Sequence, residues 1–187
     1  MEASLVSTGI VALAEIGDKT MLLAILLAAR FRRPIPILLG ILVATLLNHA
    51  LAALVGQLAA GALNGPWTKW VLGIAFLAFA GWALIPDRLE EDEAPPALKA
   101  GSVFLTTAVA FFLVEMGDKT QVATVALGAQ FHNVALVAAG TTLGMMIANA
   151  PAVLLGEVAA TKIPLKVIRW IAAAGFAAVG IWVLLAR

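Results

Sequence analysis

The sequence contains no cysteine and no tyrosine, and only 12% of its 187 residues are charged. Without cysteine the chain cannot form a disulfide scaffold, a zinc–thiolate site or a cysteine-ligated iron–sulfur cluster. A soluble domain carries about 25% charged residues, and half that density is too little to cover a surface that faces water. The net charge of +1 gives no electrostatic basis for binding nucleic acid. These deficits exclude soluble and disordered proteins and leave an integral membrane protein.

The sequence is rich in apolar residues instead: 63% are hydrophobic, and the mean hydropathy is +1.03. Six apolar runs each supply the roughly 20 residues that an α-helix needs to cross the bilayer core. Turn-forming tripeptides that end in proline separate several of these runs. We therefore predict an all-α integral membrane protein with six transmembrane helices, at residues 4–29, 35–58, 67–85, 101–130, 134–155 and 163–186.

The sequence repeats itself at an offset of 100 residues, without a gap. Of the 87 overlapping positions 22 are identical, and they include a charged block, Glu-x-Gly-Asp-Lys-Thr. Each copy holds three predicted spans, so the second copy enters the membrane from the opposite side. This is the inverted-topology repeat of many secondary transporters. The predicted units are a first three-helix repeat at 1–86, an acidic linker with prolines at 87–99, and a second three-helix repeat at 100–187.

Lysine and arginine are distributed unequally between the predicted loops. One side of the membrane receives eight of them and the other side two, and the richer side faces the cytoplasm by the positive-inside rule. We predict a multi-pass protein of the cell (inner) membrane, with the linker inside and both termini outside. The oligomeric state stays open, a homo-oligomer included. The eight residues are Arg30, Arg32, Arg33, Arg88, Lys99, Lys162, Lys166 and Arg169, against Lys69 and Arg187.

Each copy of the charged block lies near the middle of an apolar run. An ionisable side chain at the bilayer centre costs at least about 2.5–3.5 kcal/mol, so the buried charges must meet one another or water. On a continuous helix Glu15 and Asp18 share a face, as do Glu115 and Asp118. The two-fold relation between the repeats then brings four carboxylates to one cavity near the midplane. We predict that these four residues are metal ligands.

The chemistry of this cavity favours a hard divalent cation. Carboxylate, carbonyl and hydroxyl oxygens suit Ca²⁺, Mg²⁺ and Mn²⁺. Lys19 and Lys119 are predicted to compensate the charge of the acids or to take part in proton coupling. Gly17 and Gly117 weaken the helix locally and can turn backbone carbonyls toward the ion. Pairing of the glutamates with the lysines on a solvated helix surface explains neither the midplane position nor the duplication.

Further polar residues form a possible secondary site. Polar side chains inside a membrane either complete a coordination shell or join helices by hydrogen bonds, and the sequence leaves both roles open. His49 and Asn149 occupy equivalent positions of the two repeats. The candidates are Thr20, Asn48, His49, Thr120, Gln121 and Asn149.

The doubled block resembles the motif of one family of cation/proton exchangers, which includes Golgi manganese/calcium transporters, chloroplast manganese transporters and bacterial manganese exporters of the MneA type. The resemblance covers essentially the whole chain, and the run from Gly140 to Pro151 is similar to the family's fifth span. It implies exchange of Mn²⁺, and in some members Ca²⁺, for protons, with the acidic roles carried by the four residues named above. Many members have glutamine after the motif threonine; Gln121 fits, whereas Met21 stands in the first copy.

The predicted function is a secondary active transporter that exports a divalent metal cation, Mn²⁺ first and Ca²⁺ second, in exchange for protons. No nucleotide-binding motif is present, so an ion gradient must drive export. We expect no enzymatic activity and no cofactor; the partners are the metal ion, protons and the lipid bilayer. Two alternatives remain open. One is a divalent cation channel or uniporter, and the other is an intramembrane metal-dependent hydrolase of lipid phosphates.

Overall fold

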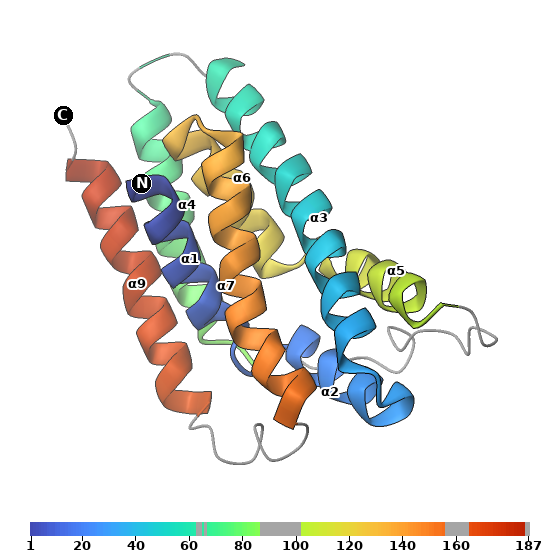
Figure 1. The fold of residues 1–187 in the computed structure, drawn as a ribbon. Coiled ribbons are helices and arrows are strands. Elements are labelled where there is room, and N and C mark those ends of the chain that lie inside the picture. The colour runs from blue at the N-terminus through green and yellow to red at the C-terminus, as the bar shows by residue number, and fades with distance from the viewer. Residues whose placement is uncertain (63–64, 66, 87–101, 156–164, 186–187) are drawn as a thin grey trace.

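In the residues described by the computed structural model, every regular element is an α-helix. Figure 1 shows these helices as one bundle. The described ranges are 1–62, 65, 67–86, 102–155 and 165–185, so the predicted linker at 87–99 lies outside them. The helices are α1 (Glu2–Glu15), α2 (Lys19–Phe31), α3 (Pro34–Ala62), α4 (Thr68–Ala83), α5 (Val103–Glu115), α6 (Lys119–Phe131), α7 (Val134–Leu155) and α9 (Leu165–Leu185).

The first and fourth predicted spans are each divided into two helices. The first span becomes α1 and α2, and the fourth becomes α5 and α6. At each division a glycine adopts a left-handed conformation, Gly17 with φ 84° and Gly117 with φ 79°, which strains any residue that carries a Cβ. The prediction that Glu15 and Asp18 share a face of one helix is therefore wrong. Glu15 ends α1, and Asp18 caps α2.

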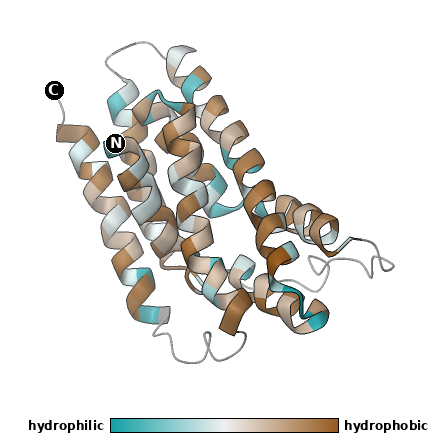
Figure 2. Ribbon diagram, viewed as in Figure 1, coloured by the Kyte–Doolittle hydropathy of each residue, from teal (hydrophilic) through white to brown (hydrophobic). Residues whose placement is uncertain are grey.

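The surface of the bundle is apolar. Large hydrophobic side chains such as Leu46, Leu47 and Leu54 of α3 are exposed, and Figure 2 shows hydrophobic residues around the long helices rather than along one inward stripe. Helices that are hydrophobic all round belong in a core or in a membrane. Three helices, α3, α7 and α9, are long and apolar enough to span a membrane, and α4 and α5 are shorter apolar helices. The chain is therefore a membrane-embedded helical protein.

The two halves of the chain pack into each other. Helix α1 lies along α7, α3 lies along both α5 and α6, and α4 lies along α9. In Figure 1, α3 and its equivalent α7 run in opposite directions, as do α4 and α9. The α4–α9 pair packs against α1 and α6, whereas its described residues make at most marginal contact with α2 and α5. The packing of the repeat is therefore asymmetric.

Close helix contacts recur at equivalent positions of the two repeats. A Cβ added at Gly40 of α3 would lie 2.7 Å from Thr107 Cβ and 2.8 Å from the Phe104 carbonyl oxygen, both on α5. A Cβ added at Gly140 of α7 would lie 2.5 Å from the Ser4 carbonyl oxygen on α1. Ser4 and Phe104 are separated by the same 100 residues as the two glycines. The sequence repeat is thus visible in the packing.

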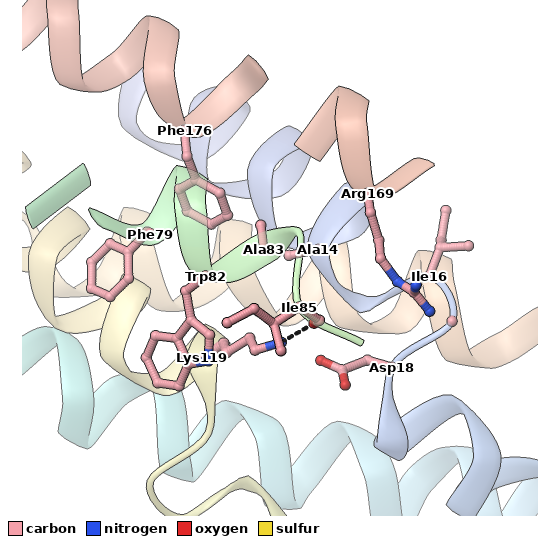
Figure 3. Close-up of a pocket in the computed structure, with 11 residues that line it drawn as sticks. Ala14, Ile16, Asp18, Phe79, Trp82, Ala83, Ile85, Lys119, Arg169 and Phe176 are labelled. Carbon is pink, nitrogen blue, oxygen red and sulfur yellow. Dashed lines mark hydrogen bonds between the residues drawn. The ribbon is translucent and has the colours of Figure 1, made fainter. Parts of the chain in front are cut away.

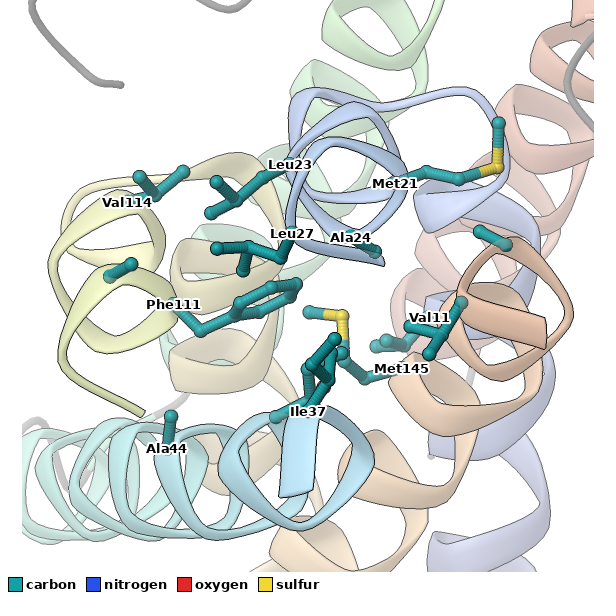
Figure 4. Packing of buried hydrophobic residues seen from close by; sticks show 14 residues of the cluster. Val11, Met21, Leu23, Ala24, Leu27, Ile37, Ala44, Phe111, Val114 and Met145 are labelled. Carbon is teal, nitrogen blue, oxygen red and sulfur yellow. The ribbon is translucent and has the colours of Figure 1, made fainter. Parts of the chain in front are cut away.

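Two apolar clusters hold the half-helices in place. The first joins α2 and α5 to α3 and α7 around Leu27, Phe111 and Met145, which Figure 4 shows converging between these helices. The second joins α1 and α6 to the α4–α9 pair through Phe76 and Phe176. Each break in a helix therefore lies between two separately packed halves.

Candidate metal centre

Asp18 and Asp118 begin the second half of each broken helix. Asp18 Oδ1 accepts a hydrogen bond from the Lys19 N–H at 2.7 Å, and Asp118 Oδ2 accepts one from the Thr120 N–H at 3.4 Å. Aspartate is favoured at this cap position, where the positive end of the helix dipole stabilises its charge. The sequence Gly-Asp-Lys-Thr therefore stops one helix and starts the next. The motif glutamates lie at the ends of the preceding helices.

Three acidic side chains meet at the two breaks. One carboxylate oxygen from each of Glu15, Glu115 and Asp118 lies within 4.8 Å of the others, and all three side chains are buried. The Thr20 hydroxyl donates to Glu15 Oε2 at 2.5 Å, and the Thr120 hydroxyl donates to Glu115 Oε2 at 3.3 Å. The remaining oxygen of each glutamate, Oε1, has no hydrogen-bond partner among the described residues. Since buried polar atoms are nearly always satisfied, these two oxygens could hold a cation or a proton.

The spacing of the three acids suits one ion. Hard divalent cations bind oxygen at about 2.0–2.6 Å, so opposed ligand atoms lie about 4–5 Å apart. The 4.8 Å limit on the oxygens of Glu15, Glu115 and Asp118 matches that span. Asp18, the fourth predicted ligand, is buried but lies outside this group.

The two motif lysines have different partners. Lys19 Nζ lies 3.5 Å from Asp118 Oδ1, which makes an ion pair between the two repeats. Lys119 Nζ donates instead to the Ile85 carbonyl oxygen at 2.7 Å and lies 5.9 Å from the centre of the Trp82 ring. Two identical motifs are thus held in two different environments.

A pocket reaches the first break beside the last turns of α4 and the first turns of α9. Its walls include Gly17, Asp18, Trp82, Lys119 and Arg169. Figure 3 shows the Lys119 and Arg169 side chains approaching the Asp18 carboxylate from two sides. The pocket therefore lies between the two breaks and the α4–α9 pair.

The amides among the secondary candidates make structural contacts. Gln121 Oε1 accepts a hydrogen bond from the Gly117 N–H at 2.6 Å, and its Nε2 donates to Asn48 Oδ1 at 2.8 Å. This pair ties the second break to α3. Asn149 Nδ2 donates to the Met145 carbonyl oxygen of its own helix at 3.1 Å. The amide nitrogen of Asn149 is thus engaged within α7.

His49 is a third secondary candidate that lies beside the acids, together with Thr20 and Thr120. It lies on α3, it is fully buried, and its Nε2 lies 3.7 Å from Glu115 Oε2. Sequence reasoning missed a pocket-lining residue, Arg169, which it used only for orientation. An arginine near the start of an apolar helix looks like an ordinary interfacial residue, so no sequence signal separated it from the others.

An apolar helical bundle with buried acids at two broken helices defines a membrane-embedded protein of the transporter class. The sequence profile of the family described as "Divalent cation/proton antiporter GDT1" matches residues 3–91 and 103–187. The chain belongs to this family, which is a family of cation transporters and not of enzymes. The resemblance drawn from the doubled motif is confirmed.

Similar curated proteins agree with this assignment. A Vibrio cholerae protein named "Putative manganese exporter" is 48% identical over 177 residues, which cover 94% of this chain and 87% of the relative. Two rice proteins, from Oryza sativa subsp. indica and subsp. japonica, are both named "GDT1-like protein 4". Each is 29% identical over 185 residues, covering 87% of this chain and 66% or 65% of the relative. No solved structure matches the chain.

Proposed function

We propose that the protein is a secondary active transporter that exports Mn²⁺ from the cytoplasm in exchange for protons. The observation that carries the proposal is the buried group of Glu15, Glu115 and Asp118, whose oxygens lie within 4.8 Å of one another at the breaks of two helices. The family supports divalent cation/proton antiport, and the name of the V. cholerae relative supports manganese. Ca²⁺ is the second candidate, because it also takes oxygen ligands.

Protons and the metal ion compete for the same oxygens in this proposal. A carboxylate must lose its proton before it coordinates a metal, so the acid group holds either protons or an ion. Moving two positive charges outward against about 100 mV costs about 4.6 kcal/mol, which an inward proton gradient can supply. The protons need no separate binding site, because the carboxylates carry them.

The asymmetric packing supports an alternating-access cycle. The α4–α9 pair packs on α1 and α6, and a pocket beside it is lined by Asp18 and Lys119 of the two breaks. The Lys19–Asp118 ion pair would close the route between the acids and the membrane surface on the α1 and α6 side. The sequence repeat suggests the second state, in which α4–α9 packs on α2 and α5, Lys119 pairs with Asp18, and the Lys19–Asp118 pair is broken.

We also propose six membrane crossings in two inverted repeats, with the two halves of each broken helix together making one crossing. The pocket lies beside the end of α4 and the start of α9, and Figure 1 shows the start of α9 at the same end of the bundle as the connection from α2 to α3. Among the described residues, Arg30, Arg32, Arg33, Lys166 and Arg169 lie at this end, which supports a cytoplasmic location. The described state would then be open toward the cytoplasm, with both termini outside.

Transport by variants tests the proposed site. Neutralising each acid separately by Glu15→Gln, Asp18→Asn, Glu115→Gln or Asp118→Asn should abolish Mn²⁺ flux into proteoliposomes. Glu2→Gln is the matched control, because Glu2 is an exposed acid in the first turn of α1. Near-normal flux in all four site variants, in protein shown to be correctly inserted, would refute a shared acidic site.

A further inference from the structure

His49 has no hydrogen-bond partner in the described structure, although it is fully buried. Both ring nitrogens are inaccessible to solvent, and neither makes a hydrogen bond to the described side chains and backbone groups. A buried, unsatisfied polar group is costly and calls for an explanation. A neutral imidazole has one N–H donor and one nitrogen with a lone pair. The lone pair can accept a hydrogen bond or bind a metal ion.

The position of the ring indicates which of these it meets. Nε2 lies 3.7 Å from Glu115 Oε2, and Glu115 is one of three acids whose oxygens lie within 4.8 Å of one another. Two ligands of one ion are separated by no more than about 4–5 Å at the usual metal–ligand distances. The imidazole therefore adjoins the acids through Glu115, although His49 is not one of the three residues whose ligand atoms lie within 4.8 Å of one another.

The backbone at His49 is held through its neighbour in the sequence. Its neighbour Asn48 accepts a hydrogen bond at 2.8 Å from Gln121, whose Oε1 accepts one at 2.6 Å from the backbone of Gly117. This connection ties α3 to the break in the second repeat. The segment of α3 that carries His49 is therefore held against the second break.

The second repeat offers no equivalent nitrogen. The residue equivalent to His49 is Asn149, whose amide nitrogen donates to the Met145 carbonyl oxygen within α7. An asparagine can offer a metal only its amide oxygen. The nitrogen donor therefore comes from the first repeat alone, and the site is chemically asymmetric although the acidic motif is doubled.

We propose that His49 is a direct ligand of the transported ion and that its nitrogen gives the site a preference for divalent transition metals over Ca²⁺ and Mg²⁺. Imidazole nitrogen binds transition metals, whereas Ca²⁺ and Mg²⁺ are bound by oxygen. Mn²⁺ accepts the mixed set of three carboxylates and one imidazole, and Ca²⁺ gains nothing from the nitrogen. The inference rests on the proposed transport of a divalent metal and identifies the residue that selects among such metals.

The test detects the nitrogen on the metal directly. Purified full-length protein is loaded with Mn²⁺, and electron spin-echo envelope modulation reports any ¹⁴N bound to the paramagnetic ion. We expect strong ¹⁴N coupling in the wild type and in His132→Asn, and its loss in His49→Asn. Incorporation of ¹⁵N-histidine into the wild type should replace the ¹⁴N signal by a ¹⁵N signal, which decides the question even if His49→Asn does not fold.

The selectivity is measured by calorimetric titration with Mn²⁺ and with Ca²⁺. We expect the preference for Mn²⁺ over Ca²⁺ to fall about tenfold or more in His49→Asn, as losses of metal-site residues commonly do. His132→Asn is the matched control because His132 is exposed and has φ 49°, a conformation that asparagine tolerates.

Two results would overturn the inference. One is Mn²⁺ that binds to the wild type without nitrogen coupling, and the other is an unchanged Mn²⁺/Ca²⁺ ratio in His49→Asn. Neither of these results would argue against the proposed acidic transport site. Nitrogen coupling in a protein that moves Mn²⁺ without protons would instead reject the proposed exchange and keep the ligand.

Discussion

Replacing Gly117 by alanine tests whether the backbone imposes the break in the fourth span. Gly117 has φ 79°, and an added Cβ would meet no atom within 4 Å, so the substitution adds left-handed strain without a clash. That conformation costs an L-residue about 1–2 kcal/mol, and we expect Gly117→Ala to lower the free energy of unfolding by this amount. If the chain relieves the strain by joining α5 and α6 into one helix, part of the Mn²⁺ binding free energy is used to form the break again. Since 1.4 kcal/mol is a factor of ten, the Kd for Mn²⁺ should then rise about tenfold.

Two other glycines supply the controls, with unfolding followed in mixed detergent micelles. An added Cβ at Gly81 of α4 also meets nothing within 4 Å, but Gly81 is helical, so Gly81→Ala should be neutral or stabilising by up to about 1 kcal/mol. At Gly128 the Cβ would overlap the backbone of Ala53, and Gly128→Ala should destabilise the protein more than either. If Gly117→Ala matches Gly81→Ala in stability and binds Mn²⁺ like the wild type, the left-handed break is refuted.

Three further predictions concern the site and the topology. Mn²⁺ affinity should fall steadily as the pH is lowered, because each carboxylate must release its proton to the solvent before it binds the metal; a pH-independent Kd from calorimetry would contradict shared use of the acids. Lys19→Met removes the 3.5 Å pair with Asp118 and should favour the second state. A cysteine introduced at Ile16, which lines the pocket, should then react more slowly with a thiol reagent from the cytoplasmic side. Unchanged labelling would reject the proposed role of the ion pair in alternating access. A cysteine placed in the 87–99 linker should resist an impermeant reagent in intact cells, and labelling there would reverse the proposed orientation.

Much of the architecture could be predicted from the sequence, because the relevant signals are local or repeated. Apolar runs indicated membrane-embedded helices, and the 100-residue offset indicated contacts that recur at Gly40 and Gly140. The doubled motif indicated the family. Of the four acids predicted to meet, Glu15, Glu115 and Asp118 have oxygens within 4.8 Å of one another, whereas Asp18 lies outside this group.

The breaks were harder to predict, because a glycine in an apolar run is compatible with a continuous helix. Only the packing of each half against different neighbours shows that Gly17 and Gly117 leave the helical region. The difference between Asp18 and Asp118 could not be predicted at all. The two copies of the motif contain the same residues, but the structure holds these copies in two different environments. For the same reason the sequence could not show that His49 lies beside Glu115.

The most direct test of proton-coupled export is thermodynamic. Sealed proteoliposomes contain a lumenal pH dye and equal Mn²⁺ on both sides, the membrane potential is clamped, and a proton gradient is imposed. Proton-coupled exchange predicts that Mn²⁺ moves up its own gradient, opposite to the protons, and that Glu115→Gln abolishes both movements. Mn²⁺ that only ever flows down its own gradient, with no change in lumenal pH, would contradict exchange and reduce the protein to a channel or uniporter.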